Sequence, residues 1–156
     1  MGTFNKIIVK KKIAILGSTG SIGQSLLNII KKNKNDFDVL LLSANKNYKR
    51  LLKQAIFFNV KNLIITDKNI FLKIKEKKVF KKFNIYNNFT SLNIIFKNRK
   101  IDYIMSSITG IEGLDPTLKI IKYSKKIAIA NKEAIICGWG LIKKELKKYN
   151  VNFIPV

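Results

Sequence analysis

The sequence predicts an α/β fold in which a doubly wound, mostly parallel sheet carries helices on both faces. Three observations predict this class. Apolar runs of strand length alternate along the whole chain with stretches whose apolar residues recur at helical spacing. The first run, residues 13–16, leads directly into three evenly spaced glycines. A second run, residues 39–43, is almost continuously apolar, as in a strand that is covered on both faces.

The elements of the first half follow from their apolar spacing. After the strand at 12–17, apolar residues at helical intervals predict a helix over 21–32, and the polar stretch 33–36 ends it. Beyond the strand at 39–43, the pattern predicts a helix over 48–58 and a strand at 63–66. Asp67 or Asn69 is expected to cap the next helix. The apolar residues at helical spacing in the three helices are Ile22, Leu26, Leu27 and Ile30, then Leu51, Leu52, Ala55 and Ile56 on one face, then Ile70, Phe71, Ile74 and Val79.

The second half is less regular at its start. A short strand at 84–86 and a short helix at 91–96, capped by Thr90 or Ser91, precede a clear strand at 101–107. Gly110, Gly113 and Pro116 then lead into a helix over 117–123 and a strand at 126–130. A helix begins at 132–137, is interrupted by two glycines, and resumes as an amphipathic helix over 141–149 with Leu146 and Tyr149 inward. The last strand is expected at 151–156.

Length and composition indicate a single soluble domain. The 156 residues, 47% of them hydrophobic, fit the soft prior of roughly 150 residues per domain. We interpret residues 1–11 as an N-terminal extension and residues 12–156 as the domain. The sequence has no apolar run long enough to span a membrane and no signal-peptide pattern, so we expect a cytoplasmic location. A single cysteine and no histidine exclude an internal disulfide and histidine-based chemistry.

The net charge of +22 raises the alternative of a basic nucleic-acid-binding module. Arg50 and Arg99 are the only arginines, although arginine binds phosphates and base edges better than lysine does because it can donate two parallel hydrogen bonds. The lysines are scattered among Asn, Ile and Phe rather than gathered in one arm. This pattern favours solvated lysine faces with non-specific affinity for polyanions, and we expect no specific nucleic-acid partner.

The glycine segment after the first strand has the layout of a dinucleotide-binding turn. Gly17 would let the strand turn sharply, Gly20 would leave the backbone open to a pyrophosphate, and Gly23 would let the helix pack closely on the sheet. The helix N-terminus offers N–H groups and a positive dipole end, and Thr19 and Ser21 add hydroxyl donors. The sequence therefore predicts a Rossmann-like fold. The alternative is a Gly/Ser-rich loop without a ligand.

The residues after the second strand favour NADP(H). A domain that prefers NAD usually has Asp or Glu here to hold the ribose hydroxyls. This chain has Asn45, Lys46 and Asn47, so a 2′-phosphate would meet amides and a lysine instead of a like charge. The alternative is an ordinary polar turn, because Asn and Lys occur throughout the sequence.

Other polar residues follow strands at the same predicted edge of the sheet. Ser107 comes at the end of the strand at 101–107, and Asn131, Lys132 and Glu133 come directly after the strand at 126–130. Ligands of open parallel sheets bind outside the carboxyl ends of the strands, so we expect these residues in the binding crevice. A solvated surface position remains the alternative for Lys132. We expect Cys137 to be a small core residue, and Trp139 to pack against the sheet or to cap a pocket.

Four motifs together resemble the 1-deoxy-D-xylulose 5-phosphate reductoisomerase family. They are Gly-Ser-Thr-Gly-Ser-Ile-Gly at 17–23, Ala-Asn-Lys-Asn at 44–47, Gly-Ile-Glu-Gly-Leu-Asp-Pro-Thr at 110–117 and Ala-Asn-Lys-Glu at 130–133. The resemblance covers essentially the whole chain and corresponds to the family's N-terminal NADPH-binding domain. Asn45 stands where the family usually has glycine, and Ala134 where it usually has serine.

The resemblance implies a reductoisomerase of the non-mevalonate pathway of isoprenoid synthesis. A divalent metal chelates the substrate, the carbon skeleton rearranges to an aldehyde, and NADPH delivers a hydride to give 2-C-methyl-D-erythritol 4-phosphate. Thr19 to Ile22 would hold the pyrophosphate, Lys46 and Asn47 the ribose phosphate, and Lys132 the substrate. The cofactor-binding residues expected in all are Thr19, Gly20, Ser21, Ile22, Asn45, Lys46, Asn47, Ser107, Asn131 and Glu133.

The resemblance also predicts which parts of the enzyme this chain lacks. The family's catalytic and C-terminal domains, and the acidic ligands of its Mg²⁺ or Mn²⁺, would lie beyond Val156, so we expect neither a catalytic residue nor a metal ligand in this chain and no turnover by it alone. The full-length enzyme is expected to be a homodimer acting on a small phosphorylated sugar. The alternative among enzymes is another NADP-dependent reductase, of the aspartate semialdehyde dehydrogenase type.

Overall fold

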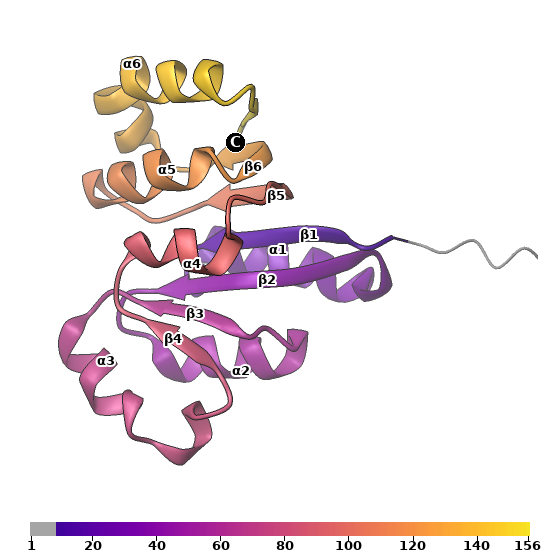
Figure 1. The fold of residues 1–156 in the computed structure, drawn as a ribbon, viewed down its shortest axis with the longest axis vertical. Helices are drawn as coiled ribbons and strands as arrows, with labels where there is room; N and C mark the ends of the chain where they lie inside the picture. Colours follow the sequence, from indigo (N-terminus) through magenta and orange to yellow (C-terminus); the bar gives the residue numbers. More distant parts are fainter. Residues whose placement is uncertain (1–8) are drawn as a thin grey trace, which may run out of the picture.

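The computed structural model describes residues 9–156, and these form one seven-stranded parallel sheet with helices on both faces (Figure 1). The strand order is β4-β3-β2-β1-β5-β6-β7, and every neighbouring pair is parallel. This confirms the predicted doubly wound α/β class. The strands are β1 (Lys11–Leu16), β2 (Phe37–Ala44), β3 (Asn62–Ile65), β4 (Asn84–Tyr86), β5 (Ile101–Ser106), β6 (Ser124–Ile129) and β7 (Asn152–Pro155).

The helices divide equally between the two faces of the sheet. One apolar core contains side chains of α1, α2 and α3, and the other contains side chains of α4, α5 and α6. In Figure 1, α5 and α6 lie at the end of the molecule that carries the C-terminus, and α2 and α3 lie at the opposite end. The bounds are α1 (Ser21–Lys32), α2 (Tyr48–Phe58), α3 (Lys68–Lys75), α4 (Leu92–Phe96), α5 (Leu114–Ile121) and α6 (Lys132–Lys148).

The central strand β1 contributes to both cores because its side chains alternate between the faces of the sheet. Ile13 and Ile15 pack into the core of α1 to α3, whereas Ala14 and Leu16 pack into the other. The chain adds β2, β3 and β4 on one side of β1 and then crosses to add β5, β6 and β7 on the other. The switch in winding direction therefore lies between β1 and β5, where open α/β sheets form their ligand crevice.

Two predicted helix boundaries are wrong. Helix α6 is continuous over Lys132–Lys148 and is not interrupted at its glycines. Gly138 is buried, and a Cβ atom there would lie 2.3 Å from Leu114 Cδ1, so this glycine permits close packing of α6 on α5. Helix α5 starts at Leu114 rather than at Thr117, with Pro116 in its first turn, where a missing N–H costs nothing.

Several side chains lie differently from the prediction. Cys137 is exposed and not part of the core, because it lies on the solvent side of α6. Ile22 and Ile56, which belong to the apolar patterns of α1 and α2, are 39% and 52% exposed, and Val79, expected on α3, lies beyond the end of that helix and is also exposed. Trp139 does pack against the sheet, with its ring centroid 5.3 Å from that of Phe153 in β7.

The remaining expectations concern the chain ends and membranes. Most of the predicted N-terminal extension, residues 1–8, lies outside the described residues, and β1 already begins at Lys11. Within residues 9–156, no helix is long and apolar enough to cross a lipid bilayer.

Candidate functional site

A cleft of about 360 Å³ opens at the carboxyl ends of β1, β2, β3 and β5. It lies at the switch point of the sheet and brings together residues from sequence segments far apart in the chain. Four of the predicted cofactor residues line it directly, namely Thr19, Gly20, Asn45 and Ser107. Further walls come from Thr66, Phe89 and the start of α5.

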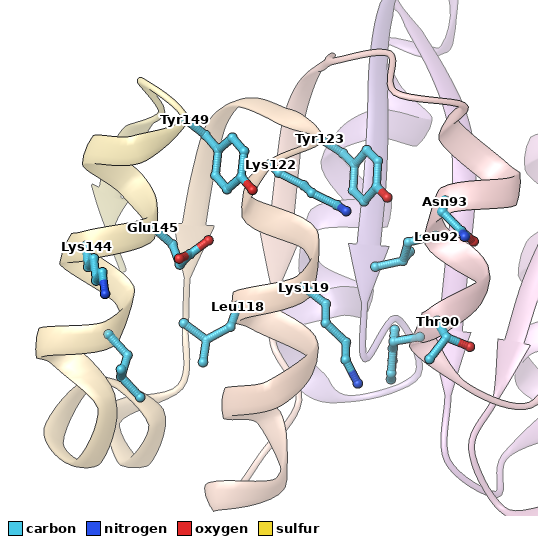
Figure 2. Close-up of a pocket in the computed structure, with 12 residues that line it drawn as sticks. Thr90, Leu92, Asn93, Leu118, Lys119, Lys122, Tyr123, Lys144, Glu145 and Tyr149 are labelled. Carbon is cyan, nitrogen blue, oxygen red and sulfur yellow. The ribbon is translucent and has the colours of Figure 1, made fainter.

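A larger hollow of about 470 Å³ lies elsewhere, between α4, α5 and α6 (Figure 2). Its walls combine apolar side chains such as Leu92 and Leu118 with lysines, among them Lys119 on α5 and Lys122 at the C-terminal end of that helix (Figure 2). None of the predicted site residues lines it. The glycine turn therefore belongs to the cleft and not to the larger hollow.

The glycine turn fits closely against neighbouring backbone. Gly17 has a positive φ of 78°, and a Cβ atom there would lie 2.7 Å from the carbonyl oxygen of Ser107. A Cβ atom on Gly23 would lie 2.5 Å from the carbonyl oxygen of Gly17 and 2.6 Å from Ser18 Cα. The sharp turn predicted at Gly17 is confirmed. Gly23 permits close packing, but against the turn itself rather than against the sheet.

Two residues outside the motif hold this turn in place. Ser43, in β2, accepts hydrogen bonds from the N–H groups of Gly17 (3.0 Å, to Oγ) and Ser18 (2.9 Å, to the carbonyl oxygen). Gln54, in α2, accepts from Ser18 Oγ at 2.8 Å and donates from Nε2 to the Ser18 carbonyl oxygen at 2.9 Å. Sequence reasoning did not identify Gln54, because it lies 36 residues away from its partner.

The N-terminus of α1 has no side-chain cap. Its N-cap residue is Gly20, whereas α2, α3 and α6 are capped by the side chains of Asn47, Asp67 and Asn131. The first N–H groups of a helix have no intrahelical partner, and together with the helix dipole they attract anions. Ser21, the next residue, is exposed on this first turn. This end of α1 is therefore suited to bind phosphate.

The segment after β2 carries cations and no carboxylate. Asn45, Lys46 and Asn47 are all exposed there. Lys46 Nζ lies 3.8 Å from Asp67 Oδ2 at the end of β3. One helical turn into α2, Arg50 donates from Nη1 to the carbonyl oxygen of Thr19 at 3.4 Å. Arg50 was not among the predicted site residues, since only this tertiary contact distinguishes it.

At the start of α6, the Asn131 side chain is buried and already hydrogen-bonded. Its Nδ2 donates to the carbonyl oxygens of Ile108 and, at 2.7 Å, Gly110, while its Oδ1 accepts from Ala134 N–H at 2.8 Å. Asn131 thus fixes the loop after β5 to α6. Its predicted contact with a cofactor stays a prediction.

Lys132 and Glu133 lie outside the cleft. Both are exposed and line a separate hollow of about 370 Å³, together with Ile22 and Ala130. The start of α1 borders both spaces, since its N-cap residue Gly20 lines the cleft and Ile22 lines the hollow.

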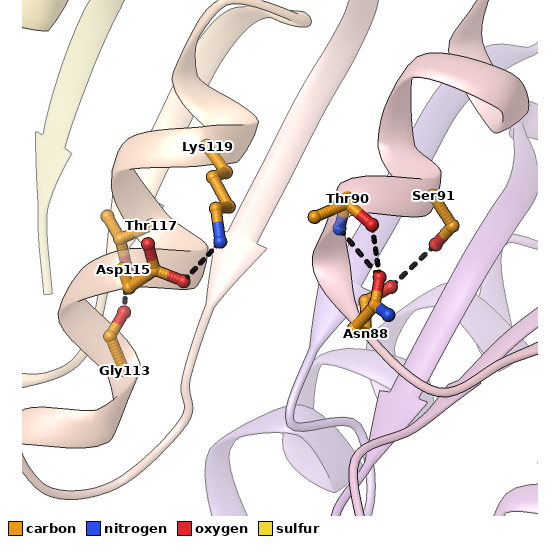
Figure 3. A network of polar contacts seen from close by, with 7 residues as sticks. All are labelled: Asn88, Thr90, Ser91, Gly113, Asp115, Thr117 and Lys119. Atoms are coloured by element: carbon orange, nitrogen blue, oxygen red, sulfur yellow. Dashed lines mark hydrogen bonds and ion pairs between the residues drawn. The ribbon is translucent and has the colours of Figure 1, made fainter.

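Polar contacts order the far wall of the cleft (Figure 3). Thr117 Oγ1 donates to the Gly113 carbonyl oxygen at 2.6 Å, and Asp115, which lines the cleft, is paired with Lys119 at 2.7 Å. Figure 3 shows Asn88 and its partners on the neighbouring segment across from this pair. Within the described part of the chain, no group of three or more His, Cys, Asp or Glu side chains could hold a metal ion.

Comparisons with known proteins agree on one family. A family model described as 1-deoxy-D-xylulose 5-phosphate reductoisomerase matches residues 13–139. The protein of that name from Pelagibacter ubique (strain HTCC1062) is 60% identical over 147 residues, covering 94% of this chain and 38% of the relative. That from Clostridium tetani (strain Massachusetts / E88) is 38% identical over 148 residues, with the same coverage of both chains.

Solved structures give the same result. The chain is similar to 1-deoxy-D-xylulose 5-phosphate reductoisomerase from Zymomonas mobilis in complex with NADPH, with a TM-score of 0.83 and 30% identity over 94% of this chain and 38% of that one. A homoserine dehydrogenase from Thiobacillus denitrificans has a TM-score of 0.60 at 14% identity, a likeness of fold alone. This chain spans about 38% of the length of the curated relatives cited above. It belongs to the 1-deoxy-D-xylulose 5-phosphate reductoisomerase family.

Proposed function

We propose that this chain is the NADPH-binding part of a reductoisomerase that converts 1-deoxy-D-xylulose 5-phosphate to 2-C-methyl-D-erythritol 4-phosphate in non-mevalonate isoprenoid synthesis. The observation that carries the proposal is the uncapped N-terminus of α1, which follows the tight Gly17 turn at the switch point of the sheet. Family membership and the NADPH bound by the Zymomonas mobilis relative support it.

The contacts that we propose follow the parts of NADPH in order. The backbone around Thr19, Gly20, Ser21 and Ile22 would bind the pyrophosphate through its N–H groups. At one end, Lys46 and Asn47 would bind the phosphate on the adenosine ribose, beside Asn45. At the other end, Ser107, Asn131 and Glu133 would lie near the nicotinamide and Lys132 near the substrate. Since Asn45–Asn47 contain no carboxylate, the 2′-phosphate of NADPH meets no like charge from this segment.

The proposal extends to the whole enzyme through the family. Its substrate would be a small phosphorylated sugar, and the full-length protein would be a cytoplasmic homodimer. A relative solved with magnesium supports a divalent metal for the complete reaction. Because the described residues contain no cluster of metal-ligating side chains, we assign no metal ligand in this chain and derive no step through the metal.

Calorimetry with the 156-residue chain tests the cofactor. We expect NADPH to bind and NADH to bind at least about tenfold more weakly, because the 2′-phosphate adds a charge-assisted contact. Gly20→Val should abolish NADPH binding, since its side chain would cover the backbone that meets the pyrophosphate. The variant should stay folded, because a Cβ atom at Gly20 meets only the Gly17 carbonyl oxygen, at 3.5 Å. Absence of heat with the unchanged chain would contradict the proposal.

A further inference from the structure

Among the cations of residues 9–156, Arg50 is the one that hydrogen-bonds to the glycine turn itself. It lies at the third position of α2, where Asn47 Oδ1 caps its N–H at 3.2 Å, and its Nη1 donates to the Thr19 carbonyl oxygen at 3.4 Å. This contact joins the start of α2, which follows β2, to the turn that precedes α1. These are the elements that the proposed function assigns to the adenosine ribose and to the pyrophosphate.

The two cations beside the glycine turn, Lys46 and Arg50, differ in their ionic partners, and Arg50 borders the groove between α1 and α2. Lys46 already has an acidic partner, because its Nζ lies 3.8 Å from Asp67 Oδ2. Within residues 9–156, no Asp or Glu oxygen lies within 4.0 Å of the Arg50 guanidinium. Its contact with Thr19 is a long hydrogen bond to a neutral carbonyl, and the side chain is exposed. Arg50 can therefore exchange this bond for a phosphate at little cost.

The position of α2 relative to the turn is fixed one helical turn further along. Gln54 lies on the same face of α2 as Arg50, at the i+4 position, and makes two hydrogen bonds with Ser18. Gln54 and Arg50 thus contact consecutive residues of the turn. The base of the Arg50 side chain is held at a defined distance from the turn, while its guanidinium stays exposed.

We propose that Arg50 determines specificity for NADPH by binding the 2′-phosphate on the adenosine ribose, with Lys46 as the weaker second cation. This inference rests on the proposed function and adds to it a residue that the sequence motifs do not contain. A guanidinium presents two parallel N–H donors to a phosphate, which the ammonium group of Lys46 cannot do. The cofactor phosphate would replace Thr19 as the acceptor of Arg50.

Titration of NADPH and NADH into variants of the 156-residue chain tests this role. Arg50→Gln should weaken NADPH binding by about tenfold or more, the usual range for a hydrogen bond to a charged group. NADH, which lacks the 2′-phosphate, should bind with less than about twofold change, the effect expected of an exposed charge that makes no specific contact. Arg50→Lys should weaken NADPH binding by an intermediate factor, because lysine keeps the positive charge but lacks the paired N–H donors of the guanidinium.

The matched control is Lys53→Gln, on the same helix. Lys53 and Arg50 both border the groove between α1 and α2, but no hydrogen bond joins Lys53 to the glycine turn within residues 9–156. This variant should leave both affinities unchanged. Three results would overturn the inference: equal weakening of NADPH and NADH by Arg50→Gln, no weakening of either, or an equal effect of Lys53→Gln. If the unchanged chain bound neither cofactor, the proposed function itself would fail, and the inference with it.

Discussion

Gly17 and Gly23 make room for the backbone of the turn rather than for a ligand. The carbonyl group of Gly17 faces the start of α1, and the carbonyl group of Ser107 approaches Gly17 from β5. Both glycines therefore serve the packing of three backbone segments, while Gly20 faces the cleft. Gly17 and Gly20 both line the cleft, so the motif combines two glycines at the binding site with one, Gly23, that serves packing alone.

Substitution by alanine should separate packing from helix propensity. Gly23→Ala places a Cβ atom 2.5 Å from the Gly17 carbonyl oxygen, and backbone cannot yield cheaply, so we expect destabilisation by roughly 1–3 kcal/mol. Gly140→Ala in α6 meets no atom within 4 Å and should stabilise by up to about 1 kcal/mol. Thermal unfolding of the two variants beside the unchanged chain measures both effects. A gain of stability at both positions would contradict the close packing at Gly23.

At the scale of elements, most strands and helices could be predicted because their signals are local. Continuous apolar runs identified the strands, and helical spacing identified α1 and α2. The continuity of α6 could not be predicted, because a glycine within a helical pattern usually indicates a break. It is compatible with a continuous helix where a side chain of a neighbouring element packs directly against the glycine. Here Leu114 of α5 packs in this way. The exposure of Cys137 likewise depends on which face of α6 meets α5.

The binding site could be predicted only where its residues belong to motifs. The glycine turn and the segment after β2 were visible as sequence patterns, and the cleft brings Thr19, Gly20, Asn45 and Ser107 together. The roles of Arg50 and Gln54 could not be recognised from the sequence, because both are polar residues among other polar residues of α2. Only the packing of α2 beside the glycine turn brings them into contact with it. The buried position of Asn131 also arises from a tertiary contact, with the loop after β5.

Asp102 joins three strands of the sheet and should make stability depend on pH. In β5, its Oδ1 accepts from Lys125 Nζ of β6 and its Oδ2 accepts from the Lys12 N–H of β1, both at 2.8 Å. The hydrogen bond from Lys125, and then that from Lys12, lowers the pKa of Asp102 below its ordinary value of 3.8. A lowered pKa stabilises the fold above pH 3.8, and this stabilisation is lost as the pH falls through the folded-state pKa.

The variant Asp102→Asn measures this contribution. At neutral pH it should be less stable than the unchanged chain by up to about 1 kcal/mol, because the ion pair is partly exposed. The difference should shrink as urea unfolding is repeated at decreasing pH, because the stabilisation is lost as the pH falls through the folded-state pKa of Asp102. Asp38→Asn is the control, an exposed residue of β2 without an ion pair or side-chain hydrogen bond within residues 9–156. A difference that did not change with pH would show that the charge of Asp102 plays no part.

At the scale of the whole molecule, the net charge of +22 produces a positive field over the surface. Such a field attracts any polyanion, so affinity for nucleic acid alone cannot identify the function. The dependence of binding on salt separates the two functional classes. A duplex releases counterions for every phosphate contacted, whereas a small ligand held by a few local donors has no condensed counterion atmosphere to release.

We therefore expect the affinities for two ligands to fall with very different slopes in one salt series. Between about 50 and 200 mM salt, affinity for a short DNA duplex should fall on the order of a thousandfold if six phosphates are contacted. Affinity for NADPH should fall less than about tenfold, because most of its contacts are backbone N–H groups of one turn. Fluorescence titration of both ligands at each salt concentration measures the slopes. If the duplex still bound tightly at high salt while NADPH no longer bound, the result would favour a nucleic-acid-binding module. It would contradict our interpretation of the chain as a cofactor-binding domain whose lysines lie on solvated faces.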